Sequence, residues 1–126
     1  MKSKYLPVLL IALPLLFASL QVQSQDVSAT GTFSGDNKHV TTGQVSLVKT
    51  DEGMSIVLGA DFSLDNAPYP SVGLGKDGEF LLDIAKLKSL SGEQTYLLPA
   101  SVNISDFNEI YIWCEKFSVS LGSAKL

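Results

Sequence analysis

The side chains best suited to redox or ligand chemistry occur once each in this sequence: one cysteine, Cys114, and one histidine, His39. A thiolate is a nucleophile and a metal ligand, and a neutral imidazole is the commonest metal ligand in proteins. Because no second cysteine exists, Cys114 cannot form a disulfide within its own chain. It is therefore an inert buried residue, a cross-link to another chain, or a group used in redox or metal chemistry.

This pair of residues limits which sites can be built. One cysteine and one histidine cannot form a copper site of the two-histidine kind, nor a four-ligand zinc site without two carboxylates, so no metal site is predicted. Cys114 and His39 could supply axial ligands to a haem, with Met54 and Met1 as the only thioethers. A Cys-x-x-Cys-His attachment motif is absent from the sequence, so such a haem would be held without covalent bonds.

A structural interpretation of both residues stays open. Most free cysteines are small buried hydrophobic residues, and Cys114 lies close in sequence to the apolar Ile112. In the same interpretation, His39 is a loop or strand-edge imidazole that bonds to the backbone.

Motifs of other chemistries do not occur. The sequence holds no glycine-rich phosphate loop, no Gly-x-Ser-x-Gly element and no second histidine for a proton relay. Its carboxylates are scattered over predicted turns and strand ends, which is typical of a solvated surface and not of a glycosidase pair. We therefore predict that the chain is not an enzyme in its own right.

The first 24 residues have the pattern of a cleaved secretory signal peptide. A basic head with Lys2 and Lys4 precedes an apolar stretch from Leu6 to Leu20, and small or short residues follow up to Ser24. The apolar stretch is shorter than the ~20 residues of a membrane span, and it contains two prolines. We expect cleavage between Ser24 and Gln25, export to the periplasm or the extracellular space, and no stable membrane span afterwards.

The remaining residues 25–126 have the size of one domain and an acidic composition. Loss of Lys2 and Lys4 changes the formal net charge from −4 to −6, and the chain contains no arginine. Because nucleic acids and anionic lipids are bound mainly through basic side chains, the composition argues against both as partners.

Apolar and polar residues alternate along most of residues 25–126, and glycine or proline separates the alternating segments. This pattern predicts an all-β fold, an antiparallel β-sandwich of seven to eight short strands. The stretch from Glu79 to Leu87 fits a strand or a helical turn, and Ile110 to Leu121 is the longest strand candidate. The other strand candidates lie around Val27 to Phe33, Val45 to Leu47, Met54 to Leu58, Ala60 to Leu64, Val72 to Leu74 and Gln94 to Leu98.

Alternation in the last candidate strand assigns its side chains to faces. Cys114 shares one face with Ile110 and Ile112, whereas Tyr111 and Trp113 share the other. Alternation resumes three residues after Cys114, which predicts a bulge near Glu115-Lys116, and bulges often re-aim a side chain at a site.

Several segments together resemble a known family; they are Gly31-Thr32-Phe33, His39, Gly43 with Val45 and Leu47, Asp61-Phe62, Pro68 to Leu74, Gly92 to Pro99, Ile110 to Val119, and Gly122 with Ala124 and Leu126. The set resembles the DM13 domain, a small secreted β module often found beside DOMON domains. The resemblance covers about residues 31–126. Its most specific part is the Trp113-Cys114 strand together with the Gly-x-Gln-x-Tyr-x-x-Pro segment at 92–99.

The resemblance implies extracytoplasmic electron transfer through the cysteine, as a bare thiol or as a ligand to a group such as haem. Carried over to this chain, the cysteine is Cys114, the histidine position is His39, and Trp113 packs near the site. Family members commonly read Gly-Pro-Asp-Leu-x-Val-x-Leu where this chain has Ala67 to Leu74. The glycine and the acidic residue are missing here, so a role for that carboxylate does not carry over.

The residues and the resemblance leave two functions open. In the first, the chain is an exported redox module that exchanges electrons through Cys114 with an unidentified donor or acceptor. In the second, it is a non-catalytic module that binds an envelope or extracellular protein, and Cys114 is structural. A homodimer linked through Cys114 is a further alternative.

Overall fold

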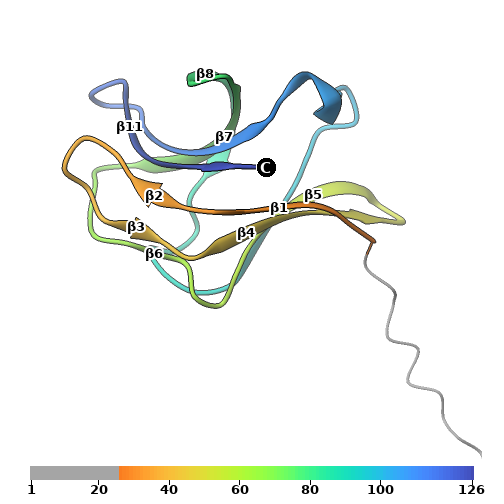
Figure 1. The fold of residues 1–126 in the computed structure, drawn as a ribbon, viewed down its shortest axis with the longest axis horizontal. Helices are drawn as coiled ribbons and strands as arrows, with labels where there is room; N and C mark the ends of the chain where they lie inside the picture. Colours follow the sequence, from red (N-terminus) through yellow and green to blue (C-terminus); the bar gives the residue numbers. More distant parts are fainter. Residues whose placement is uncertain (1–25) are drawn as a thin grey trace, which may run out of the picture.

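Alternating apolar and polar residues form strands throughout residues 26–126, the part of the chain that the computed structural model describes. Two antiparallel sheets face each other (Figure 1). The apolar side chains of the core lie between them. The predicted all-β, antiparallel sandwich is therefore confirmed. The predicted signal peptide over residues 1–24, with cleavage after Ser24, lies outside the described residues and stays a prediction.

Eight of the strands have four or more residues, and three are two-residue strands. In chain order they are β1 (Asp26–Thr32), β2 (Ser34–Gly35), β3 (Thr41–Thr42), β4 (Gln44–Thr50), β5 (Gly53–Leu58), β6 (Ser63–Leu64), β7 (Pro70–Lys76), β8 (Glu79–Lys86), β9 (Gln94–Leu97), β10 (Glu109–Cys114) and β11 (Val119–Lys125). A short 3₁₀ element, η1 (Ile104–Asp106), precedes β10 and is the only helical element within residues 26–126. No helix in this range has the length and apolar character needed to cross a bilayer.

The strands form two larger sheets and one small one. The first has the order β1-β4-β5-β9, the second has the order β2-β11-β10-β7-β8, and β3 pairs with β6. Strands β7 and β10 lie at the centre of the second sheet, so their backbones are hydrogen-bonded on both sides. Backbone bonding on both sides holds the residues of β10 in a fixed register.

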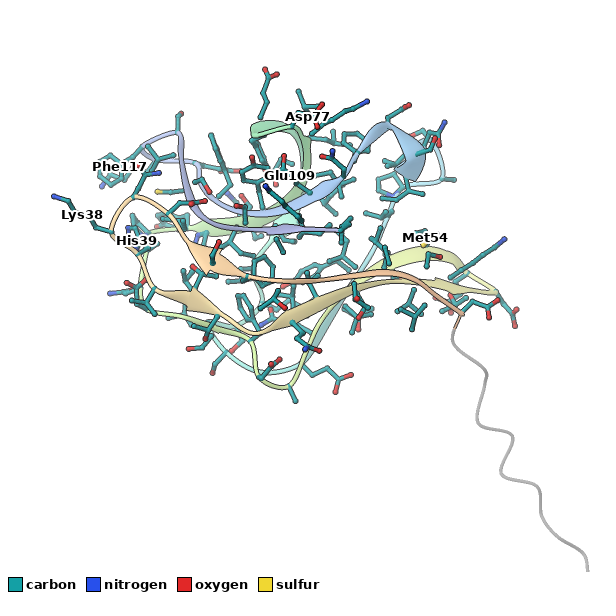
Figure 2. The ribbon with its side chains drawn as sticks, in the orientation of Figure 1. Lys38, His39, Met54, Asp77, Glu109 and Phe117 are labelled. Atoms are coloured by element: carbon teal, nitrogen blue, oxygen red, sulfur yellow. The ribbon has the colours of Figure 1, made fainter. Side chains whose placement is uncertain are left out.

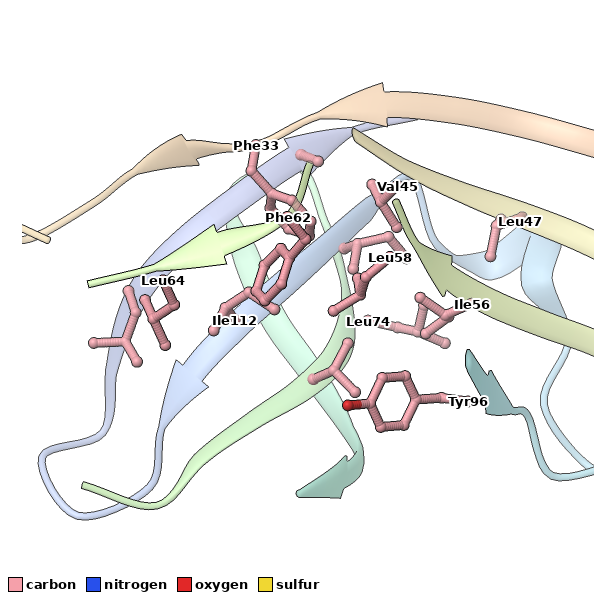
Figure 3. Close-up of a cluster of buried hydrophobic side chains, with 14 of the residues drawn as sticks. Phe33, Val45, Leu47, Ile56, Leu58, Phe62, Leu64, Leu74, Tyr96 and Ile112 are labelled. Atoms are coloured by element: carbon pink, nitrogen blue, oxygen red, sulfur yellow. The ribbon is translucent and has the colours of Figure 1, made fainter. Parts of the chain in front are cut away.

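The core lies between the two larger sheets, and the inward positions of each strand supply it. Figure 3 shows part of this cluster, with Val45, Leu47, Ile56 and Leu58 from the first sheet opposite Leu74 and Ile112 from the second. Small residues and aromatic rings occupy the outward positions of β7 and β10 instead. Each fully buried aliphatic side chain stabilises the fold by roughly 1.5–3 kcal/mol.

Two predicted segments, residues 79–87 and residues 110–121, differ in detail from the strands that the structure contains. Of the two alternatives left open for Glu79 to Leu87, the strand is present, and it is β8 over Glu79–Lys86. The segment from Ile110 to Leu121 is not one strand but the hairpin β10–β11, with a turn over residues 115–118. The bulge predicted near Glu115-Lys116 is wrong, because these residues belong to that turn. A bulge that was not predicted lies in β11, where Leu121 is the extra residue between the partners of Ile112 and Trp113.

The assigned core predicts that replacing Leu58 and replacing Leu97 have different effects on the free energy of unfolding. Leu58 is fully buried, whereas half of the surface of Leu97 is exposed. Leu58→Ala is expected to lower the free energy of unfolding by about 2–5 kcal/mol, because it removes apolar contacts and leaves a cavity. Leu97→Ala serves as the control and should cost less than about 1 kcal/mol in chemical denaturation. Equal losses for the two variants would contradict the assigned core.

Candidate functional site

Cys114 is the last residue of β10 and points into the sandwich. Its register partners are Pro70 in β7 and Val119 in β11, and 1% of its surface is exposed. The thiol belongs to the continuous apolar core, as predicted from its alternation with Ile112. Its one polar contact is to the carbonyl oxygen of Pro68, to which Sγ donates at 3.8 Å.

The loop between β6 and β7, residues 65–69, covers this thiol. Pro68 and Tyr69 are exposed, so the carbonyl above Sγ belongs to a surface segment. Tyr69 adopts φ of +49°, a left-handed conformation that costs a non-glycine residue about 1 kcal/mol or more. Cys114 is therefore enclosed by core side chains on one side and contacts a strained surface loop through the Pro68 carbonyl.

Hydrogen bonds from Asp65 connect the loop 65–69 to His39 and Val40. Its Oδ2 accepts from the backbone N–H of Val40 at 3.0 Å, and its Oδ1 lies 3.0 Å from Nδ1 of His39. The N–H of Asn66 also donates to Oδ1, and the N–H of Asp65 itself donates to the carbonyl of Val40. These donors, above all the Val40 N–H, lower the pKa of Asp65 from 3.8 to about 2.

The two predicted haem ligands, Cys114 and His39, thus form hydrogen bonds to different partners. Cys114 bonds to Pro68, His39 bonds to Asp65, and no hydrogen bond in the described part of the chain joins Cys114 to His39. What connects them is the loop 65–69, which contacts His39 at its start and Cys114 near its end. Sequence spacing gives no sign of this link, because Asp65 and His39 are 26 residues apart.

These residues do not fit a haem as the chain is folded. A haem ligand must present its donor atom to a macrocycle, whereas Sγ of Cys114 is enclosed by core side chains and the Pro68 carbonyl. Met54, the thioether of the described chain, packs against the core from the other sheet, and Figure 2 shows it far along the molecule from His39. Within residues 26–126, no three His, Cys, Asp or Glu side chains are grouped to hold a metal ion.

Trp113 lies on the opposite face of β10 from Cys114, where it stacks on Phe80. The two ring centroids are 4.2 Å apart with an angle of 5° between the planes, and Tyr111 meets both rings edge-on. Glycines of β7 make room for this layer, because a Cβ on Gly73 would lie 2.4 Å from the Phe80 ring. Trp113 therefore packs on the outer face of the sheet and not against the thiol.

Charged side chains border this aromatic layer. Glu115 forms an ion pair with Lys86, which lowers the pKa of Glu115. Desolvation raises the pKa of the neighbouring Asp83, and the adjacent Glu115 carboxylate raises it further. The hydroxyl of Ser71, the residue paired with Trp113, is buried and has no hydrogen-bond partner in the described chain.

A cavity of about 500 Å³ lies elsewhere, between the turn at Asp77-Gly78 and the start of β10 at Glu109. Asn108, Lys125 and Leu126 complete its lining. Since Glu109 and Cys114 are the first and last residues of β10, the cavity and the thiol are about 17 Å apart along the strand. The cavity therefore does not contribute to the surroundings of Cys114.

The fold and the site define a small β-sandwich module with one free, buried cysteine that contacts a surface loop. Residues 32–126 match the protein-family model described as Electron transfer DM13, so the chain belongs to the DM13 family and is an electron-transfer module. The predicted resemblance over about residues 31–126 is thereby confirmed. No curated protein and no solved structure matches the chain.

The Asp65 contacts predict a pH dependence of the covering loop. Because the folded pKa of about 2 lies below the usual value, these contacts stabilise the loop above about pH 4 and are lost as pH falls towards 2. The amide resonance of Val40 should therefore titrate with a midpoint near 2, and this titration should vanish in Asp65→Asn. A midpoint near 4 would contradict the assigned hydrogen bonds.

The aromatic layer predicts a fluorescence change. Trp113 is the only tryptophan, so its emission reports directly on the contact with Phe80. Phe80→Leu should shift the emission to longer wavelength and reduce the near-ultraviolet circular dichroism, because the indole becomes more hydrated. Leu81→Ala, on the same strand but half exposed, is the control and should leave both signals in place. Identical spectra for Phe80→Leu and the unaltered protein would contradict the stacking.

Proposed function

We propose that this electron-transfer module is exported and works through Cys114 as a bare thiol. Family membership supports electron transfer, and Cys114 is the only cysteine of the chain. The observation that carries the proposal is the position of Sγ beneath the Pro68 carbonyl, at the end of a strand and under one exposed loop. In this proposal the loop must move away before a partner sulfur can reach Sγ.

The chemistry that suits a single thiol is exchange with a disulfide of a donor or acceptor protein. The Cys114 thiolate attacks one sulfur of the partner disulfide, a mixed disulfide forms, and the partner's other sulfur leaves as a thiolate that takes up the released proton. One thiol of the electron donor then attacks the sulfur of Cys114 in this mixed disulfide, which releases the second thiol of the acceptor and joins the donor to Cys114. The donor's second thiol attacks the donor sulfur of that bond, which closes the donor's own disulfide and restores the Cys114 thiol. One S–S bond forms and one breaks in each step, so the electrons of the donor thiols reach the acceptor disulfide.

The predicted export agrees with this chemistry, because thiols and disulfides exchange in oxidising compartments outside the cytoplasm. The partner is then an extracytoplasmic or envelope protein that carries a disulfide or a thiol pair. A covalent homodimer through Cys114 would need the same loop movement, and a non-reducing gel of the folded protein would reveal it.

The alternative function is a non-catalytic binding module with a structural cysteine. The 1% exposure of Cys114 and its place in the core favour this alternative. The two functions differ in one property, the reactivity of the thiol in the folded protein.

The discriminating experiment is the rate at which an aromatic disulfide reagent modifies Cys114 in the native protein. We expect a slow single-phase reaction that Asp65→Ala accelerates roughly tenfold, because the loop loses charge-assisted hydrogen bonds. Asp51→Ala, at the exposed β4–β5 turn, is the matched control and should leave the rate unchanged.

Two results would favour the structural cysteine. One is a native thiol that reacts only after denaturant is added, and the other is an Asp65→Ala rate equal to that of the control. Cys114→Ala provides the zero-reaction baseline in each case.

A further inference from the structure

Polar side chains gather on the outer face of the second sheet, opposite the face that carries the thiol. Ser71 of β7 is paired with Trp113 of β10 on one side and with Lys86 of β8 on the other. Asp83 of β8 is paired with Gly73, two residues along β7 from Ser71. Because paired residues point to the same face of a sheet, and residues two apart in a strand do so too, Ser71, Lys86 and Asp83 all lie on the outer face.

Glu115, which directly follows β10, completes this group. Its carboxylate forms an ion pair with Lys86 and therefore lies over the same face. Desolvation and the nearby Glu115 carboxylate raise the pKa of Asp83, so the two acids are neighbours. Ser71, Asp83 and Glu115 are called the oxygen cluster below.

The hydroxyl of Ser71 is the unsatisfied atom of the oxygen cluster. Ser71 is fully buried, and its Oγ is the single buried side-chain N or O atom of residues 26–126 without a hydrogen-bond partner. It lies beside both acids, since it helps to lower the pKa of Asp83 and of Glu115. Buried polar atoms are normally satisfied, so an open hydroxyl oxygen between two carboxylates points to a bound group that all three oxygens contact.

The charge of the cluster indicates the sign of that group. Two carboxylates and the Lys86 ammonium leave one negative charge. The ion pair between Lys86 and Glu115 is weak, because the lysine side chain is 56% exposed and solvent screens it. A divalent cation in place of the ammonium neutralises both acids and also gives the Ser71 oxygen a partner.

From this arrangement we infer that the oxygen cluster is a calcium site, in which Asp83 and Glu115 supply carboxylate oxygens, Ser71 supplies its hydroxyl oxygen, and water completes the coordination. Calcium binds about six to eight oxygen atoms in a flexible geometry, whereas magnesium needs a near-octahedral site. Ligands from two strands and a turn suit the larger, less demanding ion. The inference goes beyond the proposed function and does not depend on it.

This site differs from the metal chemistry considered for Cys114 and His39. It uses oxygen atoms only, and its third protein ligand is a hydroxyl. It is therefore distinct from a group of three His, Cys, Asp or Glu side chains, of which residues 26–126 contain none. With only two carboxylates, the expected dissociation constant is about 10⁻⁴–10⁻³ M, the range of extracellular calcium modules, which agrees with the predicted export.

The test is a titration of the isotope-labelled protein with calcium chloride at constant ionic strength, followed by NMR. We expect the amides of Ser71, Asp83 and Glu115 to shift along one saturable curve, and magnesium to bind about tenfold more weakly. The emission of Trp113, the register partner of Ser71, should change along the same curve. Calcium should also lower the midpoint of the Asp83 titration, because a cation favours the carboxylate.

Matched variants separate this site from a general attraction of calcium to acidic side chains. Ser71→Ala keeps both acids and should weaken calcium binding about fivefold, whereas Lys86→Met removes the competing ammonium and should strengthen it by a similar factor. Asp83→Asn should abolish the saturable shifts. Asp51→Asn with Glu52→Gln changes two acids of the exposed β4–β5 turn and should leave the dissociation constant unchanged.

Three results would overturn the inference. The first is a set of unsaturable shifts spread over the exposed acids of the chain, and the second is a Ser71→Ala dissociation constant equal to that of the unaltered protein. The third is a raised Asp83 midpoint that calcium does not change, which would mean that Asp83 and Glu115 share a proton and bind no cation.

Discussion

The register of β10 against β7 is the constraint on which the site depends. Because side chains alternate along a strand, the pairing of Cys114 with Pro70 and of Trp113 with Ser71 fixes the thiol inside the sandwich and the indole outside it. The same pairing places Pro68, two residues before Pro70, above Sγ. A slip of one residue would expose the thiol on the outer face and bury the tryptophan in the core.

Because of this register, the inner and outer faces of the second sheet carry different kinds of side chain. The inner face supplies core aliphatic side chains with the thiol at their end, whereas the outer face carries stacked rings on small residues of β7. Strand β10 ends at Cys114, and the turn over residues 115–118 follows it. Loops open at lower free energy than central strands, and the proposed reaction of the thiol depends on such an opening of residues 65–69.

Much of the fold could be predicted from the sequence. Strict alternation of residue types indicated the strands, the opposite faces of Cys114 and Trp113, and the antiparallel sandwich. The hairpin turn at 115–118 was missed because it contains neither glycine nor proline; Ser118 adopts the left-handed conformation there instead, with φ of +52°. Turn residues of that kind carry no clear signal in a single sequence.

The site was less accessible to prediction. Cys114 and His39 stood out as single copies of reactive residue types, but their surroundings depend on contacts between distant segments. Nothing in the sequence distinguishes Asp65, whose carboxylate joins two loops, or Phe80, which stacks on Trp113. Such pairings are decided by strand order and register, which composition and periodicity do not specify.

The most direct test of the central claim is intact-protein mass spectrometry of the folded chain in glutathione buffers of graded redox potential. We expect a single glutathione adduct at Cys114 that forms under oxidising conditions and disappears under reducing ones, while circular dichroism shows the sandwich intact. An adduct that forms only when the protein is unfolded would contradict it and would leave Cys114 as a structural residue.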